Sequence, residues 1–215
     1  MIRSVKNSAY IFLLLFAACK SKPKELPLPF INKPDFTPEW IAMGDSNYAS
    51  IHRIPSFSFT DQDGATVTEK TVEGKIYVAD FFFTRCGSIC PKLTSNMGIL
   101  QEKFKDDDEV LLLSHSVTPG IDSVPVLKRY AAEKGVISAK WHLLTGNRDS
   151  IYTLAKKQYY AGDTVGYYQT GNQFLHTENF ILLDKHRRIR GIYNGTLPLE
   201  MERLSDDIGT LKKEE

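Results

Sequence analysis

Residues 81–91 read Phe81-Phe82-Phe83-Thr84-Arg85-Cys86-Gly87-Ser88-Ile89-Cys90-Pro91. The aromatic run completes an apolar strand pattern, and Pro91 suits the first turn of a following helix. Two thiols at a helix start can share one soft metal ion or close a disulfide, and the N–H groups of the first turn favour thiolate over thiol. We therefore expect the chemistry of the chain at this junction, with Cys86 the more exposed and more acidic thiol.

Strand and helix patterns alternate around this stretch from residue 51 onward. Upstream, Phe57, Phe59 and Val67 flank the turn at 61–64 and predict a short hairpin. The apolar run 76–83 predicts a central strand that is buried on both faces. Downstream, the periodicity predicts strands over 110–117, 141–144, 180–183 and 188–193, and helices from Pro91 to Phe104 and over 124–134, 150–159 and 199–211.

This order of elements predicts one α/β domain of three layers with a central mixed sheet and an N-terminal β-hairpin extension. A cysteine pair after the first core strand is typical of the thioredoxin-like class. We expect this domain to occupy residues 51–215. The formal net charge of +1 gives no support for nucleic-acid binding.

The first fifty residues have a different composition. Arg3 and Lys6 precede an apolar stretch at 10–18 that is too short to span a bilayer and resembles the core of a bacterial lipoprotein signal. We expect a signal peptide over 1–18, lipid attachment at Cys19 and a proline- and lysine-rich extended tether over 19–50. A plain secretory signal or an uncleaved anchor are the alternatives. Each places the domain outside the cytoplasm, in the cell envelope, and we expect the periplasm.

The cysteine count bears on the role of the pair. The chain has three cysteines, so a lipid on Cys19 leaves Cys86 and Cys90 together in an oxidising compartment. A structural disulfide is one interpretation. It is the less favoured one, because so short a loop removes little chain entropy and a domain of this size buries an adequate core without it.

Three landmarks in order resemble the Sco (SenC) family of copper-binding thioredoxin-like proteins, across about residues 50 to 212. The first is the cysteine stretch 81–91. The second is the strand end and proline turn Ser116-Val117-Thr118-Pro119-Gly120-Ile121-Asp122-Ser123-Val124-Pro125. The third is Leu175-His176-Thr177-Glu178-Asn179-Phe180-Ile181-Leu182-Leu183-Asp184, a histidine before a strand and turn.

The resemblance implies a copper metallochaperone for the dinuclear copper centre of cytochrome c oxidase. It implies copper ligation by Cys86, Cys90 and His176, for Cu(I) and also for Cu(II). Two thiolates and an imidazole suit soft Cu(I). The implied partners are the copper-site subunit of the oxidase or another envelope copper protein, and the membrane through the lipid anchor.

Thiol-disulfide oxidoreductase activity on the cysteines of that copper site or of other envelope proteins is the alternative function. Cys86 would attack the target disulfide and Cys90 would resolve the mixed disulfide. In that case the two cysteines are catalytic, whereas the carrier function requires no enzymatic step. His176 separates the two hypotheses, because copper binding requires it and disulfide exchange does not.

The sequence departs from the family pattern at the cysteine loop and at the strand end. Gly87 replaces a common proline, and Ser88 and Thr118 replace common acidic residues, which weakens the attraction for Cu(II). None of the other four histidines has a second ligand at metal-binding spacing, and we expect structural or solvated roles for them. They are His52, His115, His142 and His186. His115 is singled out because its strand ends near the cysteines.

Overall fold

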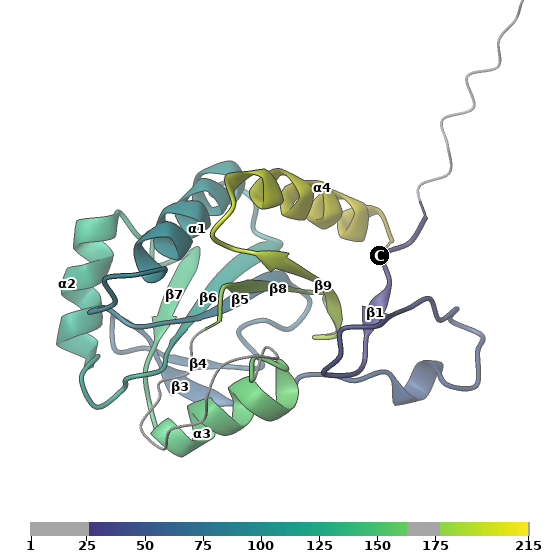
Figure 1. Ribbon diagram of the computed structural model, residues 1–215, viewed down its shortest axis with the longest axis horizontal. Coiled ribbons are helices and arrows are strands. Elements are labelled where there is room, and N and C mark those ends of the chain that lie inside the picture. The colour runs from purple at the N-terminus through teal and green to yellow at the C-terminus, as the bar shows by residue number, and fades with distance from the viewer. Residues whose placement is uncertain (1–25, 163–176, 215) are drawn as a thin grey trace, which may run out of the picture.

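The computed structural model describes residues 26–162 and 177–214. Its centre is a five-stranded sheet in the order β7-β6-β5-β8-β9 (Figure 1). The strands are β5 (Ile76–Phe82), β6 (Val110–Ser116), β7 (Trp141–Leu144), β8 (Asn179–Leu183) and β9 (Ile189–Asn194). The pairs β5–β6 and β6–β7 are parallel, whereas β5–β8 and β8–β9 are antiparallel. The predicted central mixed sheet is confirmed, with β5 as its middle strand.

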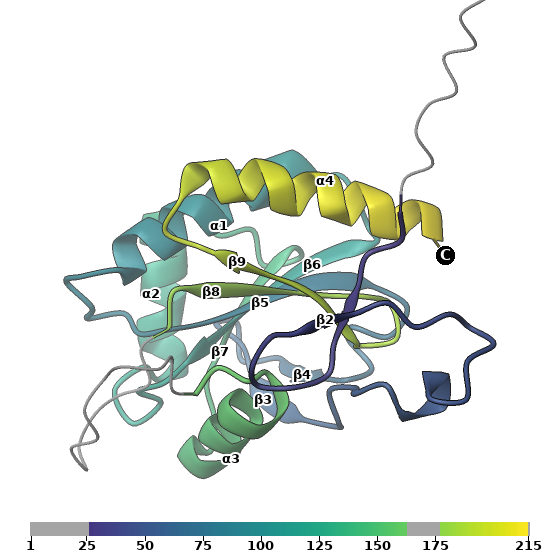
Figure 2. The ribbon, with the colours of Figure 1, turned by 45° about the vertical axis from the view of Figure 1, so that its right-hand side comes forward.

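Both faces of the sheet are covered, so every residue of β5 and β6 is buried. One face packs against α1 (Cys90–Phe104), α2 (Val124–Lys134) and α4 (Pro198–Glu214). The other face packs against the hairpin β3 (Ser58–Thr60) and β4 (Thr66–Thr68), and against α3 (Arg148–Thr153) with its π-helical continuation η2 (Leu154–Gln158). Figures 1 and 2 show these layers on the two sides of the sheet, which confirms the three-layer fold and the hairpin extension.

The helices α1 and α2 begin and end where the sequence signals lie. In α1, Pro91 occupies the first turn, and the apolar residues at helical spacing are buried against the sheet. The helix α2 ends at Gly135, whose φ of 69° is left-handed and whose N–H bonds the carbonyl of Ala131. The helix α3 begins two residues before its expected start, because the side chain of Asn147 accepts a hydrogen bond from the N–H of Ser150.

The packed part of the chain begins earlier than residue 51, the boundary that the composition predicts. The strand β1 (Phe30–Ile31) is buried and pairs with β2 (Pro38–Glu39), and the short 3₁₀ helix η1 (Tyr48–Ser50) follows. The guanidinium groups of Arg188 and Arg190 lie 4.9 and 4.3 Å from the centre of the Phe30 ring. Residues 28–39 therefore belong to the domain rather than to an extended tether, because they bury apolar surface and stack against Arg190 of β9 and Arg188 just before it.

The expected signal peptide and Cys19 lie outside the described residues. Within residues 26–162 and 177–214, none of the helices combines the length and the apolar character needed to cross a bilayer.

Candidate metal centre

The cysteine pair lies where β5 gives way to the N-terminus of α1. Because β5 and β6 are parallel, their carboxyl ends meet at one edge of the sheet, which we call the carboxyl edge; the opposite one is the amino edge. Cys90 is the first residue of α1 and only 3% exposed, whereas Cys86 is half-buried in the preceding loop. Both are free thiols, and their side chains hydrogen-bond to each other. The structure thus brings two sulfur ligands together with no rearrangement of the chain.

The two thiols have pKa values shifted in opposite directions. Partial burial acts to raise the pKa of Cys86, but hydrogen bonds from the Cys90 thiol and from the backbone N–H groups of residues 88–90 bring it below its usual value. Burial raises the pKa of Cys90 to about 12, and its hydrogen bond with Cys86 acts in the same direction. The prediction that Cys86 is the more exposed and more acidic thiol is confirmed.

A buried carboxylate, Asp122, ties the cysteine loop to the segment after β6. Its Oδ1 accepts a hydrogen bond from Thr84 Oγ1 at 2.5 Å, and its Oδ2 accepts one from the Thr84 N–H at 3.2 Å. The hydroxyls of Ser116 and Thr118 also donate to Oδ2, at 2.6 and 3.0 Å. Since Thr84 lies two residues before Cys86, Asp122 fixes the point where the loop leaves the strand.

The hydrogen bonds to Asp122 also give a structural reason for one departure from the family pattern. Thr118 stands where an aspartate is common, and here its hydroxyl is a donor to Asp122. A carboxylate in its place would face Asp122 without a proton to donate. This chain therefore uses position 118 to satisfy Asp122 rather than to add negative charge near the thiols.

The third expected ligand, His176, lies outside the described residues. Its neighbour Thr177 is buried and leads into β8. Ala79 of β5 pairs with Ile181 of the antiparallel β8, so β8 begins at the carboxyl edge. Within the described parts of the chain, no three His, Cys, Asp or Glu side chains gather closely enough to hold a metal ion.

The other histidines have structural surroundings, as the sequence predicts. His115 is fully buried among the rings of Phe57, Phe59, Phe81 and Tyr159, at centroid distances of 5.2 to 6.5 Å. His52 Nε2 lies 2.8 Å from the carbonyl of Gln158, His142 Nδ1 lies 3.0 Å from Asp61 Oδ2, and His186 is exposed in the β8–β9 turn.

Sequence reasoning missed Asp80, which it counted within an apolar strand. Asp80 is 2% exposed, and its Oδ1 has no hydrogen-bond partner in the described part of the chain. Burial raises the pKa of Asp80 to about 7, against the effect of a hydrogen bond from Ser114. A charge on Asp80 acts to raise the pKa of Cys90, which places the carboxyl near the buried thiol. The sequence signal for Asp80 was a single acidic residue in a strand predicted to be buried on both faces, because burying a carboxylate is costly.

Comparison with known proteins gives consistent matches. The family model described as SCO1/SenC matches residues 47–212. The SCO1 protein homolog of Bacillus subtilis is 33% identical over 146 residues, which are 67% of this chain and 75% of that protein.

Solved structures of similar proteins superpose on the chain. BsSco, described as a member of the Sco family of cytochrome c oxidase assembly proteins, has a TM-score of 0.63 at 30% identity, covering 75% of this chain and 95% of its own. A SCO1/SenC family lipoprotein from Bacillus anthracis has the same TM-score and identity, covering 75% and 94%. Arabidopsis thaliana ScoI with copper bound has a TM-score of 0.57 at 25% identity, covering 74% and 98%.

Proposed function

The chain belongs to the SCO1/SenC family, and on that premise we propose that it is a copper metallochaperone for the dinuclear copper centre of a cytochrome c oxidase. The observation that carries the proposal is the pair of free, hydrogen-bonded thiols at the start of α1. Similar proteins support it through their own properties, since BsSco is a cytochrome c oxidase assembly protein and ScoI binds copper. Copper is here the cargo that the domain carries and delivers.

The two thiols have different parts in taking up Cu(I). Cys86 is exposed enough to meet an incoming ion, and its lowered pKa favours the thiolate that soft copper prefers. Cys90 keeps its proton in the free protein because burial raises its pKa to about 12. Copper bound first at Cys86 displaces that proton, so uptake releases protons and becomes weaker as the solution becomes more acidic.

His176 completes the proposed site as a third ligand. The support is topological: residue 177 leads into β8 at the carboxyl edge, where Cys86 and Cys90 lie. An imidazole added to two thiolates gives a three-coordinate site that suits Cu(I).

Disulfide exchange is the second candidate, and the asymmetry of the thiols is the observation in its favour. The Cys86 thiolate would attack one sulfur of a target disulfide and release the other as a thiolate. Cys90 would then lose its proton and attack Cys86, which leaves the target reduced and the pair oxidised. Similar proteins favour the copper function, since Arabidopsis thaliana ScoI has copper bound and BsSco is a cytochrome c oxidase assembly protein.

Competition with a Cu(I) chelator tests the proposal on the full-length protein in detergent. We expect one Cu(I) per chain, lost on Cys86→Ser or Cys90→Ser and held more weakly on His176→Ala. The matched control is His186→Ala, which removes an exposed imidazole at the amino edge and leaves copper retention unchanged. Wild-type retention in the His176 variant would show that histidine ligation is wrong and would move disulfide exchange ahead.

We also propose that the domain is anchored outside the cytoplasm through lipid on Cys19. The lipoprotein from Bacillus anthracis supports this, since it belongs to the same family. Replacement of Cys19 by serine should release the folded protein from the membrane fraction, as assayed by sedimentation. Retention of the serine variant in the membrane after cleavage at residue 18 would rule out the lipid as the anchor.

A further inference from the structure

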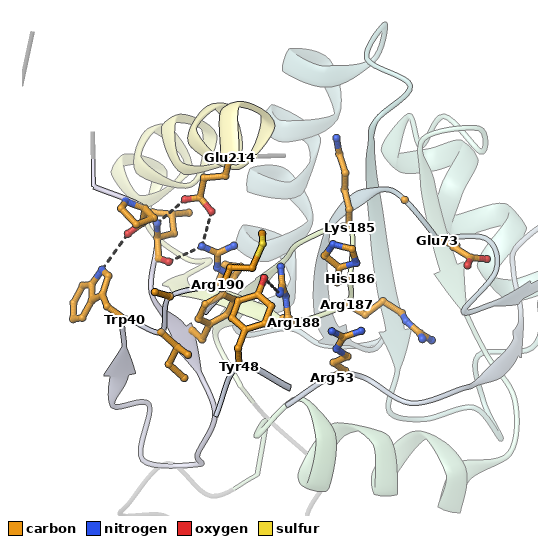
Figure 3. Close-up of a pocket in the computed structure, with 17 residues that line it drawn as sticks. Trp40, Tyr48, Arg53, Glu73, Lys185, His186, Arg187, Arg188, Arg190 and Glu214 are labelled. Atoms are coloured by element: carbon orange, nitrogen blue, oxygen red, sulfur yellow. Dashed lines mark hydrogen bonds and ion pairs between the residues drawn. The ribbon is translucent and has the colours of Figure 1, made fainter. Parts of the chain in front are cut away.

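A cleft of about 940 Å³ lies at the amino edge, between the N-terminal segment and the β8–β9 turn (Figure 3). Trp40, Met43, Arg53 and the turn residues 185–187 line it. It lies at the far end of β5 from the cysteines, because Glu73 and Gly74 line it and lie two to three residues before the start of β5. We infer that the face around this cleft is the surface by which the domain rests on an anionic phospholipid membrane.

The first support is exposed apolar surface gathered near the cleft. Leu26, Trp40 and Met43 are 77%, 61% and 82% exposed, and the last two line the cleft. The ring nitrogen of Trp40 donates to the carbonyl of Pro27 at 3.1 Å, which holds the indole at the rim. Tryptophan is the side chain that favours the boundary between headgroups and acyl chains, since it has an apolar body and a polar N–H. We call Leu26, Trp40, Met43 and Arg53 the membrane face.

The second support is charge. Five cationic and two acidic side chains line the cleft, but Arg188 and Arg190 are buried and paired with Asp184 and Glu214, and Lys185 lies 3.4 Å from Glu109. The remaining lining charges are exposed Arg53, half-buried Arg187 and exposed Glu73, a formal net charge of +1. Arg53 is exposed and forms no ion pair with any described residue. Cationic side chains beside exposed apolar ones match the phosphate groups and acyl chains of an anionic lipid surface.

The third support is where the chain leaves the domain. Leu26 is the first described residue, and residues 27 and 28 line the cleft. Cys19 lies seven residues before Leu26, a separation of at most about 25 Å for fully extended chain. This step rests on the proposed lipid anchor. Lipid on Cys19 would keep the membrane face within that distance of the bilayer.

The inference gives the domain a definite orientation. The seven residues of β5 separate the two edges by about 23 Å. A domain resting on its amino edge presents Cys86 and Cys90 at the opposite end, toward the aqueous space where a partner copper site is reached. The anchor then supplies membrane affinity, and the membrane face supplies orientation.

Tryptophan quenching tests the contact directly, because the chain has two tryptophans and Trp141 is 2% exposed. The full-length protein is incorporated into phosphatidylglycerol-containing vesicles with brominated or ordinary acyl chains. We expect bromination to reduce the emission of Trp40 by about twofold, as for an indole at the headgroup boundary. The emission that remains in Trp40→Phe comes from Trp141 and should not respond.

A matched pair of probes tests whether one face is preferred. In the Trp40→Phe background, Met43→Trp at the amino edge should restore quenching. Leu199→Trp, at a 74% exposed position in the first turn of α4 near the carboxyl edge, should not. Equal quenching of the two probes would mean that the domain has no preferred face and would overturn the inference.

Vesicle sedimentation separates failure of the anchor from failure of the face. Protein that sediments with vesicles while Trp40 stays unquenched has its anchor but does not contact the membrane through this face. If the emission of this unquenched Trp40 is also blue-shifted, another protein surface covers Trp40. Protein that fails to sediment lacks the anchor, and the membrane face is then overturned with it. Copper retention is measured independently, and it depends on neither the lipid anchor nor the membrane face.

A charge reversal tests the electrostatic part. Arg53→Glu should weaken the quenching of Trp40 in anionic vesicles and leave it unchanged in zwitterionic ones. Arg129→Glu, on an exposed position of α2, makes the same change of net charge away from the face and should have no effect. Equal effects of the two variants would show that overall charge, rather than this face, drives the contact.

Discussion

The polar groups at the two edges of the sheet differ in whether they are paired. At the amino edge, buried Asp184 lies between two buried arginines, 2.7 Å from Arg188 Nε and 3.4 Å from Arg190 Nη1. At the carboxyl edge, Cys86 and Cys90 remain free thiols, and one oxygen of the nearby buried Asp80 carboxyl has no hydrogen-bond partner among residues 26–162 and 177–214. Paired charges at the amino edge therefore hold the fold together, whereas the reactive groups at the carboxyl edge are kept available.

The amino-edge network joins segments that are far apart in the sequence. Arg190 donates to the carbonyls of Leu28 and Pro29 and pairs with Glu214 at 2.7 Å, so it connects the N-terminal segment, β9 and the end of α4. Changes here should therefore alter stability with little effect on copper. Changes at the carboxyl edge should alter copper binding with little effect on stability.

The largest expected effect comes from breaking the amino-edge network with Asp184→Asn. The variant keeps the shape of the side chain but leaves two buried arginines without their shared carboxylate. We expect the free energy of unfolding to fall by about 3 to 5 kcal/mol, because an uncompensated buried charge is costly. Urea denaturation followed by circular dichroism measures this change.

The matched control is Glu102→Gln, which breaks the exposed ion pair between Glu102 and Lys105. It should change stability far less, since exposed ion pairs contribute little. Copper retention of Asp184→Asn should match wild type at temperatures where the variant is folded. A loss of copper from the folded variant would contradict the separation of the two edges.

Ionisation of the buried Asp80 should make the stability of the domain depend on pH. The folded-state pKa of about 7 lies above the ordinary 3.8, so between these values the folded protein holds a proton that the unfolded chain has lost. The free energy of unfolding should therefore fall as pH rises from 4 to 7, by about 4 kcal/mol in total. Asp80→Asn should remove this slope in urea denaturation measured across that range. A slope that persists in the variant would assign it to other groups.

His115, in the neighbouring strand and among aromatic rings, should have the opposite effect. Burial lowers the pKa of His115 from 6.5 to about 4, so as pH falls between these values the unfolded chain takes up a proton first. The free energy of unfolding should fall by about 3 kcal/mol over this window as the solution becomes more acidic. In His115→Phe this acid slope should disappear in the same denaturation series.

Together the two groups predict a distinctive profile for the wild type. Between pH 4 and 6.5 their slopes oppose each other, and above 6.5 only that of Asp80 remains. Stability should thus vary little below pH 6.5 and decline above it. Each single variant should uncover the slope of the other residue, and a wild type with a steep acid loss in this window would contradict the cancellation.

The sequence predicted regular elements well and polar surroundings poorly. Apolar periodicity located β5 and α1, because burial against both faces of a sheet imposes the pattern directly. It missed the packing of Phe30, since the arginines that cover the ring are Arg190 of β9 and Arg188 just before it, about 160 residues later. Local composition carries no information about such a partner.

The candidate site shows the same limit. The thiol pair is visible as a motif at a strand–helix junction, and the order of their acidity follows from position alone. Asp122 is visible only as one letter of a landmark, and the four hydrogen bonds it accepts from Thr84, Ser116 and Thr118 depend on tertiary structure.

The smallest expected effect concerns the hydrogen bonds to Asp122. It tests whether these bonds position the copper ligands at the carboxyl edge. Asp122→Asn keeps the size of the side chain but replaces one acceptor oxygen with an NH₂ group facing the hydroxyls. The point where Thr84 leaves β5 should loosen and shift Cys86 relative to Cys90. We expect Cu(I) affinity to fall about 10- to 100-fold, the usual cost of losing a group that orients metal ligands.

Chelator competition measures this loss, and Thr118→Val provides a graded companion because it removes only the 3.0 Å hydrogen bond to Asp122. Thr118→Val should lower the Cu(I) affinity, but by less than Asp122→Asn does. Alkylation of the reduced protein adds a readout that a general loss of stability would not move: Cys86 should still react before Cys90 in both variants, because Cys90 remains buried. If Asp122→Asn binds copper as wild type does, the loop is positioned by the thiols and α1 alone, and the carboxyl edge needs no network to hold its ligands.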